Sequence, residues 1–467
     1  KYCKSEKSMV ILRQKEGSDM LLEFSISNFM SFEEKNTLSM IPSIQSNRGT
    51  FNISGINVLK FATIYGGNAS GKSNLIKALS TLTYIVRLGL DERHRKLYCR
   101  VHEDNKDKPT IFSVTFYANE KFYNYYFEVL LAERKVIFES LSELNPKTGN
   151  GKEIYTYTKG ELDYKKVFNL KNIDEFNKNR LKTYLFDNNM TQHKLLITDL
   201  ISKEWDDSQL SFIKDVIHWF SHININMADF PIHDMKYLEK VDERNKVEDI
   251  LRELNTGVSK IDFTKISEDE FASRTNPHFA KAIIKDVKER YSEIVKSGKK
   301  NIREFTLRGD SYYRFLFKPQ EENIDILELS LKHENCDTKF DFGDESDGTQ
   351  RLFDLLDIVF TSQPNSVYVV DELERSLHPV LTYKLIEILK EELQKKNIQL
   401  IFTTHETHIM DLKLFRKDEI WFMERDNKGL SRLYSLDIFK IRNEKIIKDG
   451  YINGLYGGIP LFKKLEE

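Results

Sequence analysis

The chain has 467 residues, of which 40% are hydrophobic and 31% are charged, and its formal net charge is −2. This composition is typical of a globular protein of one to three domains, and the charge gives no sign of a nucleic-acid binder beyond a local basic surface. No stretch has the length and apolarity of a membrane-spanning helix, no signal peptide is recognisable, and the three cysteines are too far apart for a disulfide framework, so we expect a cytoplasmic protein that does not enter the membrane.

The first predicted strand begins at Met20. Residues 1–19 are polar and mixed in charge, and we expect them to be an extension outside the fold. The alternation that follows places Leu22, Phe24 and Ile26 on one face of a strand. We therefore expect the first folded region to start at residue 20.

A second strand, 59–65, leads into a glycine-rich loop and then into a helix that starts near residue 74. The loop fits the spacing G-x-x-x-x-G-K-[ST], in which backbone N–H groups surround the phosphates of a nucleotide. Lys72 is expected to bind the β- and γ-phosphates and Ser73 to bind Mg²⁺, with the helix N-terminus facing the anion. A chance glycine turn is the alternative, but strand, loop and helix occur in the required order. The residues assigned to the nucleotide are Gly66, Gly67, Asn68, Ala69, Ser70, Gly71, Lys72, Ser73 and Asn74.

The pattern then changes twice. Aromatic and β-branched runs after residue 109 predict antiparallel hairpins, which complete a first region over 20–165. From 166 to 300 apolar residues recur at helical spacing without a sustained heptad, so we expect a compact, mostly helical insertion. Strand signals return after residue 301 and then alternate with helices, which predicts an α/β core over 301–467.

A buried strand, 366–370, ends in two carboxylates, Asp371 and Glu372. Ligands gather at the carboxyl ends of strands in α/β sheets, so Asp371 is placed to hold Mg²⁺ and Glu372 to orient or deprotonate an attacking water. An acidic turn after a strand is common and would carry no function by itself. The phosphate loop upstream favours the catalytic interpretation.

Three further segments resemble motifs of ABC-type ATPases. The loop before the apolar helix 352–360 is similar to the signature motif, with Ser346 and Gly348 at its Ser and second Gly positions and Asp347 in place of its first Gly. The strand 398–404 ends in His405, which resembles the switch histidine that contacts the γ-phosphate. Ser376 stands at the position of the D-loop residue that faces a partner subunit. No residue is assigned to the Q-loop.

Taken together, the chain from Met20 onward resembles RecF/SMC-like ABC-type ATPases, and more closely the stand-alone ATPases of anti-phage and abortive-infection systems (overcoming-lysogenization-defect, AbiL and Septu-like). The resemblance implies an α/β, ABC-type P-loop ATPase head with an antiparallel β subdomain and a helical insertion, in which 20–165 and 301–467 form the two lobes. It also implies ATP, Mg²⁺ and a head-to-tail homodimer whose nucleotide lies between the two copies. The motifs that carry the resemblance are 24–32, 66–73, 345–350, 371–379, 403–408 and 451–460.

Several functions are compatible with such a head. A transporter subunit is disfavoured because the phosphate loop and Ser346 are separated by more than half of the chain and no membrane segment is present. A single-chain nuclease is disfavoured because the short segment after His405 has no aspartate cluster for paired metal ions. An R-x₆-H match, Arg87 to His94, lies in a charged helix end. We expect an ATPase without nuclease activity that controls a separate effector of Toprim, HNH or RNase-like type.

A DNA-repair clamp of RecF type remains the alternative. It would bind DNA through basic patches, such as Arg93 to Arg100 or Lys296, Lys299 and Lys300 with Arg303. A solvated charged surface is the simpler interpretation of both patches.

Overall fold

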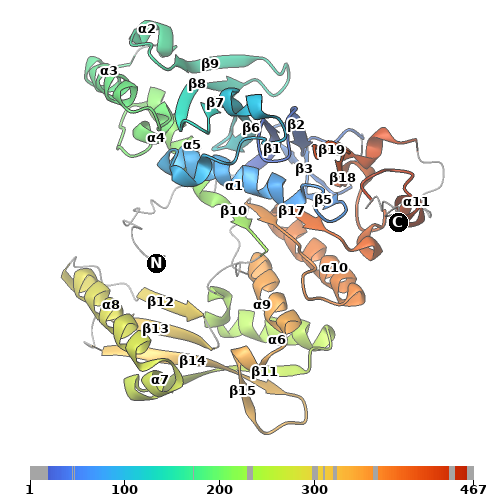
Figure 1. Cartoon of the computed structure of the whole chain (residues 1–467). Coiled ribbons are helices and arrows are strands. Elements are labelled where there is room, and N and C mark those ends of the chain that lie inside the picture. The colour runs from blue at the N-terminus through green and yellow to red at the C-terminus, as the bar shows by residue number, and fades with distance from the viewer. Residues whose placement is uncertain are drawn as a thin grey trace. The chain divides into compact units, whose positions relative to one another are not determined.

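The computed structural model (Figure 1) describes residues 19–44, 46, 48–171, 173–228, 235–296, 303–308, 311–318, 323–360, 366–440 and 447–459. Within these ranges, no helix is both long enough and apolar enough to cross a membrane. Residues 1–18 of the expected extension lie outside the described residues, as do Lys299 and Lys300 of the second basic patch.

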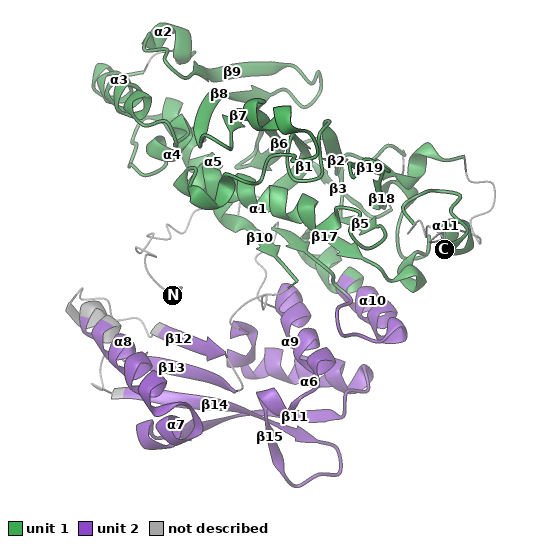
Figure 2. Cartoon of the chain, in the orientation of Figure 1, with its two compact units in different colours: residues 1–229, 363–373, 390–467 green, residues 230–362, 374–389 purple. Residues whose placement is uncertain are grey.

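The chain forms two compact units (Figure 2). The first contains residues 1–229, 363–373 and 390–467, and the second contains 230–362 and 374–389. The stretch 166–300, expected to be one insertion, is divided between these units at residue 229. The units are described separately below.

The first unit contains an antiparallel sheet with the strand order β2-β1-β6-β7-β8-β9. Alternating side chains of β6, including Phe112, Val114 and Phe116, are fully buried, as the sequence pattern predicts. Trp219 stacks on Phe116 with ring centroids 4.6 Å apart. The strands are β1 (Met20–Ser27), β2 (Asn36–Ser39), β6 (Thr110–Ala118), β7 (Lys121–Leu130), β8 (Lys135–Leu144) and β9 (Gly151–Thr158).

A second sheet of this unit has the order β10-β16-β17-β5-β18-β19, and all of its pairings are parallel except that of β18 with β19. Its central strands are buried on both faces, which explains their nearly continuous apolar sequences. The strands are β5 (Phe61–Tyr65), β10 (Ile223–Asn226), β16 (Val367–Val370), β17 (Gln399–Thr404), β18 (Ile420–Arg425) and β19 (Ser431–Ser435), with a separate hairpin of β3 (Thr50–Ile53) and β4 (Ile56–Leu59).

Two buried polar side chains join the sheets of this unit. The side-chain amide of Gln399 accepts from Leu21 N (2.7 Å) and donates to the carbonyl oxygens of Leu21 and Leu59. Asn36 Oδ1 accepts from Leu433 N at 2.7 Å. Because a buried amide without partners is costly, these contacts specify how β1 and β2 are placed against β17 and β19.

The helices of the first unit pack their apolar sides onto these sheets. Leu75, Leu79, Leu82 and Val86 recur at helical spacing along α1 and are buried. The helices are α1 (Lys72–Leu88), α2 (Tyr164–Val167), α3 (Glu175–Met190), α4 (Leu196–Leu200), α5 (Ser211–His222) and α11 (Ile447–Ile452); α10 (Pro379–Lys396) extends from the second unit into the first.

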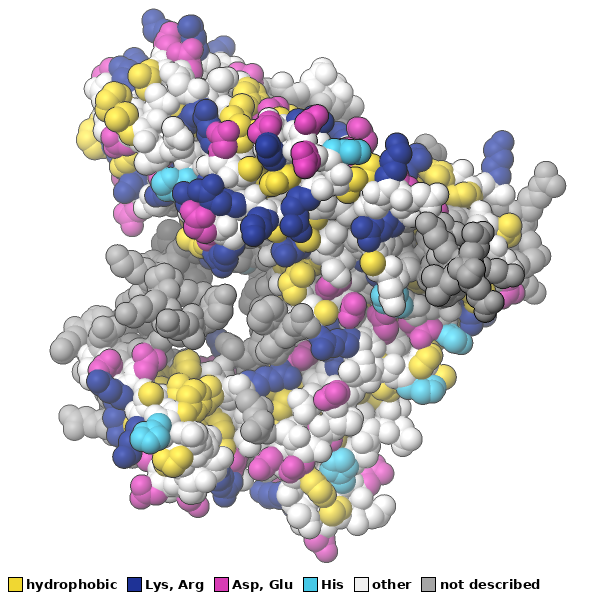
Figure 3. All heavy atoms as spheres, in the orientation of Figure 1, with side chains coloured by type: hydrophobic (Ala, Val, Ile, Leu, Met, Phe, Trp, Pro, Cys, Tyr) yellow, Lys and Arg dark blue, Asp and Glu magenta, His cyan; other side chains and the backbone are white. Residues whose placement is uncertain are grey.

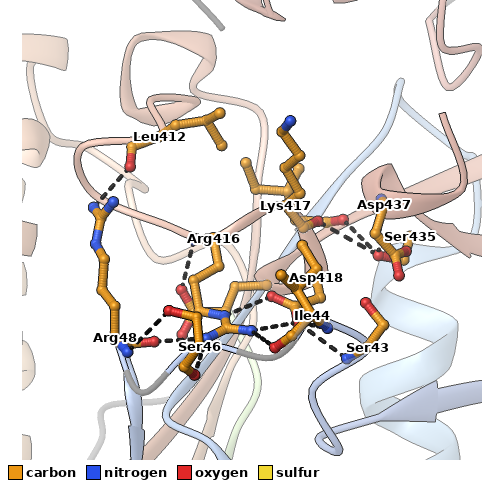
Figure 4. A network of polar contacts seen from close by, with 12 residues as sticks. Ser43, Ile44, Ser46, Arg48, Leu412, Arg416, Lys417, Asp418, Ser435 and Asp437 are labelled. Carbon is orange, nitrogen blue, oxygen red and sulfur yellow. Dashed lines mark hydrogen bonds and ion pairs between the residues drawn. The ribbon is translucent and has the colours of Figure 1, made fainter. Parts of the chain in front are cut away.

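A polar network fixes the segment after β2 in the first unit (Figure 4). The guanidinium of Arg416 forms a two-pronged ion pair with Asp418 (2.7 and 2.8 Å) and donates to the carbonyl oxygens of Ile44, Ser46 and Arg48. Both partners of the pair are almost fully buried. A buried pair satisfied in this way ties the backbone at Ile44, Ser46 and Arg48 to the turn that precedes β18.

The second unit contains a sheet of order β11-β14-β13-β12, with β15 also paired to β14. Phe271 of α7 packs edge-on against Tyr313 and Phe315 of β13, at centroid distances of 4.9 and 5.3 Å. The elements are α6 (Val241–Glu253), β11 (Val258–Ile266), α7 (Glu268–Arg274), α8 (Pro277–Lys296), β12 (Arg303–Arg308), β13 (Tyr312–Lys318), β14 (Asn323–His333), β15 (Lys339–Asp341) and α9 (Asp347–Phe360).

Two strands lie where the sequence suggested mostly helix. β10 has four residues, too few to show a period of two, and it is fixed by parallel pairing to β16. β11 mixes lysine, aspartate and threonine with its apolar residues, and it gains its stability from antiparallel pairing along β14. Long-range pairing therefore outweighs the local pattern at both places.

Candidate nucleotide-binding site

The candidate site lies at one edge of the parallel sheet in the first unit. The strands β10, β16, β17 and β5 are parallel neighbours, so their carboxyl ends meet at the same edge. The residues that follow them are the phosphate loop after β5, Asp371 after β16 and His405 after β17. This is the edge at which α/β sheets bind ligands.

The phosphate loop depends on glycine at two positions. Gly71 precedes α1 with φ of 113°, a conformation that L side chains rarely adopt, and a Cβ atom there would collide with Ser431. A Cβ atom at Gly66 would collide with the backbone carbonyl of Met423. The loop is therefore closed from behind by β18 and β19, and its N–H groups can approach an anion only because these side chains are absent.

Lys72 is buried, with 5% of its surface exposed. Its Nζ donates to the carbonyl oxygens of Gly66 (2.8 Å) and Gly67 (3.2 Å) and lies 3.4 Å from Nδ1 of His405. The ammonium group is thus held over the loop, where β- and γ-phosphates would lie. Ser73, the next residue, is exposed at the first turn of α1 and is available to a metal ion.

Thr403 organises the acidic end of β16. Its Oγ1 donates to Oδ1 of Asp371 at 2.6 Å and accepts from the backbone N–H of Glu372 at 2.8 Å. Asp371 is 2% exposed, whereas Glu372 is partly exposed and has a positive φ of 48°. A non-glycine residue in that conformation is strained, and such strain often occurs at functional sites. Thr403 thus fixes the buried carboxylate of Asp371 and the backbone of Glu372.

The pKa of His405 lies below its ordinary value. The first cause is desolvation of the ring, although part of the side chain remains exposed, and the second is the positive charge of Lys72; the charge of Asp371 opposes both. The imidazole is therefore neutral near pH 7 and has one N–H to donate. A neutral donor beside Lys72 suits the contact with a terminal phosphate that the sequence predicts.

Two serines far apart in sequence support the loop from behind. Ser431 Oγ donates to the carbonyl oxygen of Ser70 (2.6 Å) and lies 2.7 Å from Ser31 Oγ, which also accepts from the side chain of Asn74 (2.8 Å). Asn74 is among the residues that the sequence predicts for the site, whereas Ser31, Ser431 and Thr403 are not. Ser31 lies in the segment 24–32, which carries part of the family resemblance, and nothing in the local sequence of Ser431 distinguishes it.

The segment after residue 447 also reaches the loop. The N–H of Gly67 donates to the carbonyl oxygen of Gly458 at 2.8 Å, and Tyr451 donates to the same oxygen at 2.9 Å. Tyr451 stacks on Phe422 of β18, with centroids 5.3 Å apart. One phosphate-loop donor is therefore already engaged by the chain itself.

The remaining assigned residues lie in the second unit, where they meet each other. Ser346 Oγ accepts from the N–H of Thr349 (3.2 Å) and so caps the start of α9. Gly348 lies so close to the backbone carbonyl of Ser376 that a Cβ atom there would be 2.7 Å from that oxygen. The signature loop and the D-loop residue are thus one local cluster, and Ser346 is exposed.

Part of the first basic patch suggested for DNA, the segment 91–95, has local partners. Arg93 pairs with Asp91 and Arg95 with Glu92, both at 2.6 Å. His94, the end of the R-x₆-H match, is buried and its Nδ1 accepts from Asp91 N (2.9 Å). In the space-filling view, Lys and Arg side chains gather across the middle of the view, with some acidic side chains among them (Figure 3). These contacts favour the solvated, structural interpretation of the segment 91–95.

The residues fit a nucleotide with its magnesium ion. The loop leaves no room for side chains at Gly66 and Gly71, so its backbone stays accessible to an anion. Ser70 Oγ is buried without a hydrogen-bond partner among the described residues. Ser73 and Asp371 offer the hard oxygen ligands that Mg²⁺ prefers. Lys72 would bind the phosphates.

Comparison with known proteins places the chain in a family. Residues 61–411 match the family described as "AAA domain, putative AbiEii toxin, Type IV TA system". No curated protein matches the chain. Similar solved structures include an SmcHead bound to the C-winged helix domain of ScpA (14% identity, TM-score 0.37, covering 89% of this chain and 97% of that one). Another is the SMC head domain from Thermotoga maritima (13% identity, TM-score 0.33, covering 90% and 99%).

These structural likenesses are too weak to support a conclusion on function. The family match, in contrast, covers well over half of the chain and spans Lys72, Asp371 and His405. The chain therefore belongs to this family of AAA domains, whose description names a putative AbiEii toxin and a Type IV TA system.

Proposed function

We propose that the chain binds ATP with Mg²⁺ and hydrolyses it as an ABC-type ATPase. The observation that supports this most directly is the meeting of Lys72, Asp371, Thr403 and His405 around the phosphate loop at one sheet edge. Three chain segments supply these groups: the loop before α1, the end of β16 and the end of β17.

Each residue has a role that follows from its position. The loop N–H groups and Lys72 bind the phosphates and orient them. Glu372, partly exposed beside the fixed Asp371, positions the attacking water and accepts its proton, and His405 donates to the terminal phosphate. Ser73 and Asp371 hold Mg²⁺, which when bound neutralises charge developing on the phosphate oxygens.

We further propose that the catalytic site is completed by a second copy of the chain. Ser346 and Gly348 present an exposed hydroxyl and the N-terminus of α9, a helix of fourteen residues, to an anion. Their cluster with Ser376 belongs to the second unit, whereas the phosphate loop belongs to the first. A head-to-tail homodimer would bring the cluster of one copy to the ATP bound by the other.

The proposed cellular role is that of a cytoplasmic sensor or scaffold in anti-phage defence. The family description names a putative AbiEii toxin and a Type IV TA system, which supports a defence role. ATP turnover would set how long the dimer holds or releases a separate effector, such as a Toprim, HNH or RNase-like protein. A RecF-like DNA clamp is the weaker alternative, since Arg93 and Arg95 already pair with carboxylates.

The ATPase is tested with two variants. Glu372→Gln keeps the size and hydrogen bonding of the side chain but cannot accept a proton, so it should bind ATP, fail to hydrolyse it and accumulate as a dimer. Lys72→Ala should lose ATP binding. Normal turnover by Glu372→Gln would refute the role given to Glu372.

The shared site is tested by mixing inactive chains. A Lys72→Ala chain and a Ser346→Arg chain are each inactive alone if the site is composite. Their heterodimer has one site with both halves intact, so mixing should restore part of the activity. No recovery on mixing, with both variants folded and able to dimerise, would contradict a composite site.

A further inference from the structure

A cluster of two histidines and one aspartate lies in the first unit, outside the nucleotide site. We propose that Asp19, His218 and His222 bind one divalent transition-metal ion of the Zn²⁺ type. One nitrogen of each histidine and one oxygen of the carboxylate all lie within 4.8 Å of one another. The proposal does not depend on ATP hydrolysis.

The histidines are held in register by α5. His218 and His222 are four residues apart, so they project from the same side of the helix, and their ring centroids are 4.0 Å apart. His222 Nδ1 donates to the backbone carbonyl of His218 at 2.7 Å. This hydrogen bond fixes the tautomer and leaves Nε2 with a lone pair, which is the usual arrangement of a metal-binding histidine.

Asp19 supplies the negative charge. It directly precedes β1 and is only 3% exposed, and its Oδ2 lies 2.9 Å from Nε2 of His218. Its other oxygen, Oδ1, is buried and has no hydrogen-bond partner within the part of the chain that the structure describes. A buried carboxylate oxygen without a partner costs free energy that a bound cation would recover.

The donors and distances suit this class of metal. Zn²⁺ binds imidazole nitrogen and carboxylate oxygen at about 2.0–2.2 Å, which places tetrahedral ligand atoms roughly 3.4 Å apart. The distance from Asp19 Oδ2 to His218 Nε2 is 2.9 Å, and the three ligand atoms all lie within 4.8 Å of one another, so the expected separation falls between these two values. Three protein ligands leave a fourth position for water, and the mixed nitrogen and oxygen set disfavours Mg²⁺ and Ca²⁺.

Asp215, one turn before His218, is not a fourth ligand. Its two carboxylate oxygens accept from Tyr123 (2.6 Å) and from the side-chain amide of Asn119 (3.0 Å). Its charge nevertheless favours a cation near His218. The alternative interpretation is a simple Asp19–His218 ion pair, which would satisfy Oδ2 and leave Oδ1 unexplained.

The position of the cluster gives the metal a structural consequence. His222 is the last residue of α5, and β10 begins at the next residue. β10 ends at Asn226, whose carbonyl oxygen accepts from the N–H of Asp371 at 2.9 Å. A metal ion would tie the start of β1 to the beginning of the strand that flanks the acidic end of β16.

The test is metal stoichiometry on the full chain without a histidine tag. After incubation with excess Zn²⁺ and dialysis, elemental analysis should find one Zn²⁺ per wild-type chain, and Co²⁺ in its place should give the visible absorption bands of a tetrahedral site. His222→Ala should lower the affinity for Zn²⁺ more than about tenfold, since losing even an outer partner of a ligand typically costs that much. The exposed His193→Ala, in the same unit, is the matched control and should bind normally.

Folding is checked separately from binding. His222 is about 40% exposed, so its replacement should leave the fold intact, and circular dichroism of the metal-free variant checks this. Zn²⁺ should raise the melting temperature of the wild-type chain and of His193→Ala but not of His222→Ala. Absence of stoichiometric Zn²⁺ in the wild-type chain, or equal Zn²⁺ binding by folded His222→Ala, would overturn the proposal and leave an ion pair only.

Discussion

The hydroxyl of Thr403 donates a hydrogen bond to Oδ1 of Asp371 at 2.6 Å and accepts one from the backbone N–H of Glu372. A single side chain from β17 thus sets the direction of the carboxylate assigned to Mg²⁺ and the backbone of the residue assigned to the water. The acidic end of β16 is therefore built by its neighbouring strand as much as by its own sequence.

Replacement of Thr403 by Val should impair both stability and hydrolysis. Valine has nearly the same shape but removes the donor to Asp371 and the acceptor for Glu372 N, which should cost about 1–3 kcal/mol. We expect ATP hydrolysis to fall roughly tenfold or more, as for other losses of a partner that orients a metal ligand. Urea unfolding and steady-state hydrolysis measure the two effects. Thr404→Val, which removes only a bond from Glu406 N, is the control and should keep most of its activity.

Alanine at Gly71 should abolish nucleotide binding. The residue has a positive φ, and the added Cβ atom would collide with Ser431 behind the loop. Gly55→Ala is a matched control, because Gly55 also has a positive φ (91°) but faces open space. We expect a backbone strain of about 1–2 kcal/mol in both variants and a loss of ATP binding only in Gly71→Ala. Calorimetric titration with ATP distinguishes them, and tight binding by Gly71→Ala would show that the loop can move away from Ser431.

The pKa of His405 should respond to Lys72. Desolvation and then the charge of Lys72 hold it below its ordinary 6.5. Lys72→Met removes the charge with little change of volume, so an NMR titration should show the His405 pKa rising toward 6.5. Because the folded-state pKa is depressed, the unfolded chain takes up the proton first, and this residue disfavours folding as the pH falls below 6.5. An unchanged pKa in the variant would mean that desolvation alone sets it.

Glu419 should make the protein less stable as the pH rises. Burial raises the pKa of its carboxyl from 4.5 to about 7, although Arg416 N donates to it. Between these values the unfolded chain ionises while the folded chain retains the proton, so stability is lost as the pH rises toward 7 and then levels off. The loss is about 3 kcal/mol.

Glu419→Gln is the corresponding test, since glutamine keeps the acceptor and removes the ionisation. Its unfolding free energy should vary less with pH than that of the wild type, with the two curves diverging between about pH 4.5 and 7. Parallel curves across this range would show that Glu419 ionises normally in the folded chain.

The sequence by itself determined the local parts of this protein. The strand before residue 66, the glycine loop and the start of α1 depend on residues within one or two turns of each other, and the structure contains all three. The alternating hairpins of β6 and β7 follow in the same way from a period of two. The apolar runs before Asp371 and before His405 likewise predict the strands β16 and β17.

Only the tertiary structure decided what meets the loop. Parallel pairing in the order β10-β16-β17-β5 brings His405 beside Lys72 and places Thr403 under Asp371. Ser31 and Ser431 support the loop from positions 400 residues apart, and neither has a local signature. The physical reason is that strand order and register, which no local window contains, determine which distant side chains share an edge. The same holds for the metal cluster, in which Asp19 joins a helix that begins almost two hundred residues later.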